Sequence, residues 1–232
     1  MKSFWGLFFV ILGANQLSAF GSLELVNSQT LDINLVKNLT ISYSSDNIAL
    51  LESNDSSLVL KEFMTISSPE YFAKIENSQD TININGGRRP WLIRTRIEIY
   101  IPKIYIDNLT VNLRSGNINI NSFQGEANIV NRSGNIVVNN FVGKGTFDVI
   151  SGNIDLTVND IIGDIILSCN SGTIDLIMGR NISFILDAEV GSGTINAPNL
   201  RRQVNTKVQH NIGSDPIHKV FAKCGSGNIN IK

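Results

Sequence analysis

Cysteine, histidine and proline are scarce in this chain, which has 2, 2 and 5 of them among its 232 residues. The cysteines and histidines lack the spacing of a zinc site, and neither histidine has a serine or carboxylate partner in the pattern. Charge is also low, since 19 basic and 20 acidic residues give a net charge of −1, without the dense positive charge that a nucleic-acid binder needs. No glycine-rich phosphate loop precedes a helix. We therefore expect no catalytic residues, metal, cofactor or nucleic-acid partner.

A long apolar run occurs only at the N-terminus. Lys2 precedes the run from Phe4 to Ala14, and Ala19-Phe20-Gly21 offers a small-x-small cleavage site. Such a run is short for a membrane span and typical of a signal-peptide core. We expect residues 1–21 to be a signal peptide, with a retained membrane anchor as the alternative. Either predicts an exported protein, extracellular or associated with the cell envelope.

What the chain has in abundance is a repeat, Ser-Gly-(Asn/Thr)-Ile. The six copies begin at Ser115, Ser133, Ser151, Ser171, Ser192 and Ser226. Self-similarity at such short intervals is typical of stacked coils, because one unit cannot bury its own apolar face.

Within each repeat, apolar residues alternate with polar ones, as in a strand with one buried face. The alternation changes phase at the Ser-Gly pair, which requires a bend that glycine permits. A second glycine corner recurs at Phe123-Gln124-Gly125, Phe141-Val142-Gly143 and Ile161-Ile162-Gly163. The first repeats are too short for a strand–helix–strand unit. We predict an all-β fold, a single-chain β-solenoid that resembles a parallel β-helix, with coils about 4.8 Å apart.

Two columns of the aligned repeats carry further expectations. Asn117, Asn135 and Asn153 share one position, so their side chains can hydrogen-bond from coil to coil. Cys169 and Cys224 share another, but the coil that contains Val190 separates them in sequence. Two strand spacings, roughly 9–10 Å, are too far for a disulfide, and we expect two buried thiols.

The repeats divide the chain into regions. Residues 22–102 lack the Ser-Gly signature and are predicted to form a degenerate β-coil and cap. Within them, residues 39–50 resemble a coil with Ser45-Asp46-Asn47-Ile48 at its corner. Residues 103–232 are predicted to form the repeat solenoid, with an insertion at about 199–221. Atypical terminal units are expected, because uncovered end coils would template aggregation.

Two clusters are candidate sites. Asp155 and Asp175 lie on the outer face of adjacent coils, where paired carboxylates could bind calcium or act on a polysaccharide; solvated surface acids are the alternative. Arg88, Arg89, Arg94 and Arg96 surround Pro90 and Trp91. They are candidates for binding an anionic polymer or lipid headgroups; a solvated loop paired with acids such as Glu98 is the alternative.

Five kinds of segment together resemble a family of exported bacterial envelope proteins, adhesins with β-strand repeats. They are residues 36–43, Leu60-Lys-Glu-Phe-Met, Gly87-Arg-Arg-Pro, Ile97-Glu-Ile-Tyr-Ile-Pro and the Ser-Gly-Asn-Ile repeats. The resemblance implies an exported β-solenoid of Gram-positive-type bacteria, and it supplies no catalytic residues.

These observations lead to three hypotheses. The first is a non-enzymatic envelope protein that binds a cell-wall polymer, a host surface or another envelope protein, with membrane attachment through residues 1–21 as a further option. The second is a polysaccharide-active enzyme centred on Asp155 and Asp175. The third is an accessory or sensor component of an envelope-stress system.

Overall fold

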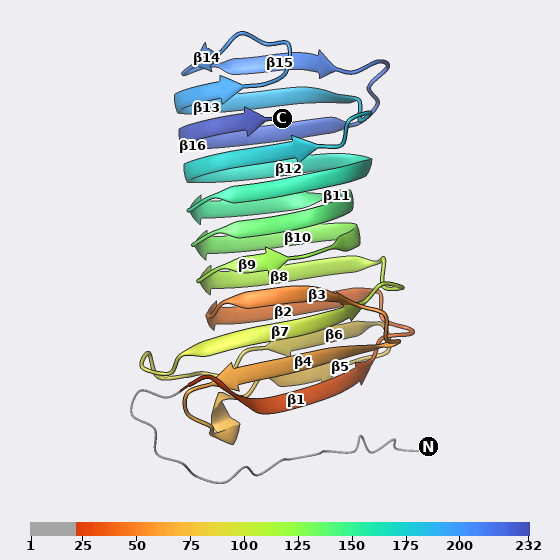
Figure 1. Ribbon diagram of the computed structural model, residues 1–232, viewed down its shortest axis with the longest axis vertical. Coiled ribbons are helices and arrows are strands. Elements are labelled where there is room, and N and C mark those ends of the chain that lie inside the picture. Colours follow the sequence, from red (N-terminus) through yellow and green to blue (C-terminus); the bar gives the residue numbers. More distant parts are fainter. Residues whose placement is uncertain (1–21) are drawn as a thin grey trace.

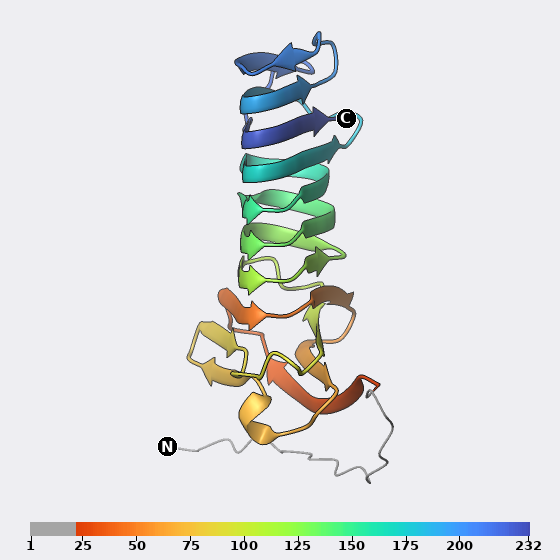
Figure 2. The ribbon, with the colours of Figure 1, turned by 90° about the vertical axis from the view of Figure 1, so that its left-hand side faces the viewer.

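The computed structural model describes residues 22–232, and the segment expected to be a signal peptide or anchor lies outside them. The described chain forms a single 16-stranded sheet that curls into a tall stack, with one short 3-10 turn (Figures 1 and 2). The prediction of an all-β fold is confirmed. No helix in this part of the chain is long and apolar enough to cross a membrane.

The strands of the N-terminal part are β1 Glu24–Asp32, β2 Asn38–Ser45, β3 Ile48–Ser53, β4 Ser57–Met64, β5 Lys74–Asn77, β6 Thr81–Asn85 and β7 Thr95–Pro102, with η1 at Pro69–Tyr71. Those of the repeat part are β8 Asn108–Ser115, β9 Ile118–Ile120, β10 Phe123–Ser133, β11 Ile136–Ser151, β12 Ile154–Met178, β13 Phe184–Asn196, β14 Gln203–Val204, β15 Lys207–Ile212 and β16 Lys219–Ile231.

The repeats stack in parallel and in register. Ser133 pairs with Ser151, Ser151 with Ser171, and Ile136 with Ile154, so each repeat lies on the equivalent residues of the next. The isoleucine that ends each repeat is buried in every coil: Ile118, Ile136, Ile154, Ile174, Ile195 and Ile229 all have 0% exposure. The predicted inward column is therefore the core of the stack.

Each Ser-Gly corner requires glycine. The corner glycines have positive φ, for example 119° at Gly134 and 141° at Gly152, a backbone conformation that side chains disfavour. A Cβ on Gly152 would lie 2.0 Å from the carbonyl oxygen of Gly134 in the coil below. The corner glycines thus allow both the bend and the close stacking of coils.

The degenerate coil predicted at residues 39–50 is also confirmed. Ser45 pairs with Ser115 and Ile48 with Ile118, so β2 and β3 form one more coil beneath β8 and β9. Antiparallel strands cover both ends of the stack. β1 pairs with β4 and β5 with β6 at the N-terminal end, while β14 and β15 pair with β13 at the other (Figure 1). The insertion at about 199–221 provides this second cap.

The order of coils in space differs from their order in sequence. β16 lies between β12 and β13, pairing in parallel with both (Figure 1). After β12 the chain leaves the space of one coil empty and forms β13 and the cap strands β14 and β15. It then returns, and β16 fills the space between β12 and β13. Residues far apart in sequence, such as Leu167 and Ala222, therefore become direct neighbours.

Candidate functional site

The arginine cluster predicted as a binding patch is split by the fold. Arg89 points inward, with a side chain only 7% exposed, and its Nη1 and Nη2 lie 2.6 Å from Asp46 Oδ1 and from Glu62 Oε1. Its Nε donates to the carbonyl oxygen of Tyr71 at 2.8 Å. Arg89 therefore belongs to an internal ion network, and including it in an exposed patch was wrong.

The two carboxylates of this network have unusual environments. Burial raises the pKa of both Asp46 and Glu62, while the neighbouring Arg89 opposes that rise. Asn27 Nδ2 and the backbone N–H of Ala73 donate to Glu62 Oε2 at 2.8 and 2.9 Å, and Thr95 donates to Asp46. Buried charges persist only when such partners replace water. The network joins the corner between β2 and β3, strand β4 and the loop before β7, so its role is structural.

Arg88, Arg94 and Arg96 are exposed. Arg96 pairs with Glu98 at 3.1 Å and lies over the ring of Phe63, 4.3 Å from its centroid. No salt bridge to Arg88 or Arg94 occurs within residues 22–232. Binding of an anionic polymer by these three side chains stays a prediction.

Asp155 and Asp175 are neighbours on the outer face. Burial, followed by the charge of Asp175, raises the pKa of Asp155, and Lys232 opposes the rise. Asp175 Oδ1 accepts from Asn230 Nδ2 at 3.0 Å and lies 3.6 Å from Lys232 Nζ. A basic partner, which no neighbouring repeat showed, is thus supplied by Lys232, the residue directly after β16. Among the described residues, no group of three or more His, Cys, Asp or Glu side chains could hold a metal ion.

The cysteines are buried free thiols, as predicted, but the argument from distance was wrong. Because β16 lies directly beside β12, Cys169 and Cys224 pair across adjacent strands. Each thiol donates to the carbonyl oxygen of a corner glycine, Cys169 to Gly152 at 3.5 Å and Cys224 to Gly172 at 3.4 Å. Burial, followed by the neighbouring Cys224, raises the pKa of the Cys169 thiol to about 12. The burial of both thiols and their bonds to the glycine carbonyls place them in the packing of the corner.

The asparagine ladder is confirmed, and it is longer than predicted. The side-chain oxygen of each member accepts the backbone N–H in the next coil at 2.9–3.1 Å, through Asn47, Asn117, Asn135, Asn153 and Thr173. In the inserted strand β16, Asn228 Oδ1 accepts a hydrogen bond from the hydroxyl of Thr194 at 2.8 Å. These bonds stabilise the first corner without a ligand.

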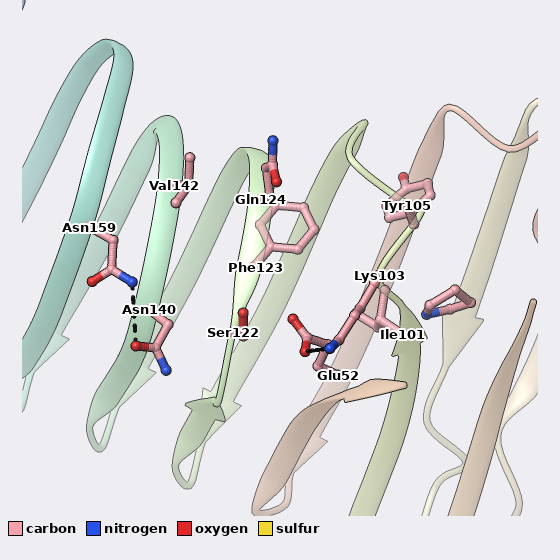
Figure 3. Close-up of a pocket in the computed structure, with 11 residues that line it drawn as sticks. Glu52, Ile101, Lys103, Tyr105, Ser122, Phe123, Gln124, Asn140, Val142 and Asn159 are labelled. Carbon is pink, nitrogen blue, oxygen red and sulfur yellow. Dashed lines mark hydrogen bonds and ion pairs between the residues drawn. The ribbon is translucent and has the colours of Figure 1, made fainter. Parts of the chain in front are cut away.

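A polar groove follows the second corner of the coils and is the best candidate site (Figure 3). Its volume is about 260 Å³. At one end Lys103 Nζ lies 2.9 Å from Glu52 Oε1, and Lys103 lowers the pKa of that carboxyl by hydrogen bonding to it. At the other end Asn159 Nδ2 donates to Asn140 Oδ1 at 3.4 Å. Ser122 and Gln124 lie between these pairs in the view of the groove.

The sequence contains a signal for this groove outside the Ser-Gly repeat motif. Ser122, Asn140 and Asn159 all lie where one coil turns into the next, before or within the second glycine corner. They could have been found by aligning the coils on Phe123 and Phe141, which pair in the structure. Glu52 and Lys103 come from outside the Ser-Gly repeats, so the repeat alone would not have located them.

The geometry defines an all-β, solenoid-like protein with a polar groove along the second corner of its coils. Residues 121–232 match the model of the family described as Toastrack DUF4097. No curated protein matches the chain.

One solved structure supports the fold. This structure, described as a "putative cell adhesion protein" from Clostridium sporogenes, has 14% identity and a TM-score of 0.52, covering 89% of this chain and 97% of that one. A "putative adhesin" from Bacteroides fragilis has 13% identity and a TM-score of 0.45, with coverages of 91% and 98%. A "putative lipid binding protein" from Parabacteroides distasonis has 16% identity and a TM-score of 0.31, with coverages of 89% and 96%. At these identities the first likeness supports the fold alone, and the lower scores of the other two add no argument.

Proposed function

We propose that this chain is a non-enzymatic, exported envelope protein of the adhesin type, which binds a hydroxyl-rich polymer of the cell wall or of a host surface. The polar groove along the second corner is the observation that carries the proposal. We assign the stack of coils to the single-chain β-solenoids, with residues 22–102 as its cap region and residues 1–21 as the export signal or anchor.

The groove suits a polymer for three reasons. Its amide, hydroxyl and ion-pair groups can donate to and accept from sugar hydroxyls. Those groups are held by bonds to one another, Glu52 to Lys103 and Asn159 to Asn140, so little side-chain entropy is lost when they bind. The stacked coils also repeat polar positions about every 4.8 Å, which favours an extended ligand over a compact one.

Catalysis has weaker support. A polysaccharide-active enzyme would need Asp155 and Asp175 beside a cleft that orients the substrate. Neither residue lines the polar groove or the hollow beside Asp46 and Arg94. Asp175 already accepts a hydrogen bond from Asn230 and forms an ion pair with Lys232. The accessory or sensor role in envelope stress remains a hypothesis, and a protein ligand in the groove would favour it.

The test is binding of the purified full chain to fractionated wall glycans, teichoic acids and host glycans, measured by calorimetry. Ser122→Ala combined with Asn159→Ala should weaken binding about tenfold, because two hydrogen-bonding groups are lost. The matched control is Asn112→Ala with Asn128→Ala, two exposed asparagines on the outer face of β8 and β10, away from the groove. Equal affinity of both double variants would refute the groove as the binding site. Absence of binding to every glycan would refute the proposal of a polymer ligand.

A further inference from the structure

Three segments meet at one corner of the N-terminal end of the stack. Glu24, at the start of β1, pairs with Met64 at the end of β4. The N–H of Thr65, the next residue, donates to the carbonyl oxygen of Arg94 at 3.2 Å, and the Arg94 N–H donates back to Thr65 Oγ1 at 3.2 Å. Leu23 lines a hollow of about 380 Å³ together with Arg94. We call this corner the N-terminal tip, made up of Leu23, Leu25, Ile66, Trp91 and Leu92 with Arg88 and Arg94.

The tip exposes four large apolar side chains. Trp91 is 90% exposed, Leu92 66%, Ile66 55% and Leu25 51%. Single exposed apolar residues are ordinary on protein surfaces. Several gathered at one corner are typical of an interaction site. The polar groove, by contrast, is lined mainly by polar groups, so the two surfaces require ligands of different chemistry.

The loop that carries Trp91 is held in place from inside. The Ile93 N–H donates to the Pro90 carbonyl oxygen at 3.0 Å, which makes Trp91 and Leu92 the two central residues of a turn. Directly before this turn, Arg89 is fixed by Asp46 and Glu62. At Gly87 the backbone packs so closely that a Cβ would lie 2.4 Å from the Tyr71 carbonyl oxygen. The exposure of Trp91 is therefore built into the loop.

The arginines beside the turn and the apolar run that precedes Leu23 in the sequence both favour a membrane as the partner of the tip. Arg88 and Arg94 flank the turn, and Arg96 is paired with Glu98; the exposed acids that precede the turn most closely in the chain are Asp80 and Glu76. Tryptophan and arginine together are typical of the membrane–water interface. The apolar run of residues 4–14 ends nine residues before Leu23. As a retained anchor it would hold a membrane within about 30 Å of the tip, which is the reach of nine extended residues.

We propose that the N-terminal tip inserts Trp91 and Leu92 into the interfacial region of a lipid bilayer. The stack then stands with its N-terminal end on the membrane, and the cap of β14 and β15 lies at the far end (Figure 1). This orientation leaves the polar groove along the side of the stack free to bind a polymer. The proposal does not depend on the groove's ligand.

Fluorescence of Trp91 tests the insertion directly. The chain has two tryptophans, Trp5 and Trp91, so Trp5→Phe in the full chain leaves Trp91 as the reporter. The probe is a vesicle of phosphatidylcholine and phosphatidylglycerol whose acyl chains carry bromine near the headgroup. Insertion should shift the Trp91 emission to the blue, and bromine should quench it.

A matched control places the reporter at the other end of the molecule. Ile217 lies in the loop before β16 and is 80% exposed, so Trp5→Phe/Trp91→Phe/Ile217→Trp carries a comparably exposed indole. On vesicles this variant should keep its water-like emission and escape quenching. Equal shifts of both reporters would show unspecific adsorption and overturn the proposal, as would water-like emission from Trp91.

A second variant measures the contribution of the tip to binding. Trp91→Ser/Leu92→Ser should weaken vesicle partitioning by at least about tenfold relative to the parent, because two large apolar side chains no longer leave water. Unchanged partitioning, or no binding of the parent chain to vesicles, would also overturn the proposal. Glycan binding by the same variant should stay at the parent level, which separates this test from that of the groove.

Discussion

Replacing Arg89 with methionine should destabilise the N-terminal part of the stack more than any surface change. The substitution keeps an unbranched side chain but removes the cation between Asp46 and Glu62, whose side chains are 3% and 0% exposed. Breaking a buried ion pair from one side costs about 3–5 kcal/mol, because a charge is left without a partner. For a chain of this size, that cost lowers the Tm by about 6–20 °C.

The effect should depend on pH in a defined direction. Burial already raises the pKa of Asp46 and of Glu62 in the folded chain, and Arg89 holds each pKa below the value that burial alone would give. A carboxyl with a raised pKa contributes stability that is present below its unfolded value, about 4, and lost as pH rises through the folded value. Removing Arg89 raises both folded pKa values further, so the variant should lose more stability on going from pH 4 to pH 7 than the parent loses.

Thermal unfolding followed by circular dichroism between pH 4 and pH 8 is the measurement. The control is Arg89→Met/Asp46→Asn/Glu62→Gln, which removes all three charges and should show a deficit that does not grow with pH. A single variant whose deficit is below about 2 °C at pH 7, or is the same at every pH, would refute the reasoning.

Three further outcomes follow from the core and the corners. Ile154→Asp buries an unpaired carboxylate at a site with 0% exposure, so its melting transition should fall by 10 °C or more, roughly, whereas Asp155→Asn should leave it unchanged. Gly152→Ala places a Cβ 2.0 Å from a carbonyl oxygen at a φ of 141° and should lower the Tm by several degrees; an unchanged Tm would contradict this account of the corner. Because both thiols are buried and the pKa of Cys169 is raised to about 12, neither cysteine should react with iodoacetamide at pH 8 until denaturant is added, and rapid labelling of the native chain would contradict that.

The coil itself could be predicted because its signal is local. The alternation of apolar and polar residues and one glycine decide which side chains point inward, and the same pattern located the coil at residues 39–50 although its corner has Asp46 in place of glycine. That departure has a structural reason. At this corner the buried side chain of Asp46 pairs with Arg89, so the position serves the ion network at the N-terminal end. The network could not be predicted, since Asp46, Glu62 and Arg89 are far apart in sequence and no repeat relates them.

The stacking order was beyond sequence reasoning for a different physical reason. Every coil has the same pattern of apolar, serine and glycine positions, so β16 can pair with β12 as well as β13 can. The local pattern therefore does not distinguish the order β12-β13-β16 from the observed order β12-β16-β13. The 34-residue step before Ser226 indicated an insertion but not that the chain would return into the stack. Strands β14 and β15 pair antiparallel with the outer edge of β13. That edge is therefore not open to β16, which pairs with the other edge of β13. The contacts of Cys224, Asn228 and Lys232 all follow from that one exclusion, which is why the expected cysteine separation was wrong while the expected burial was right.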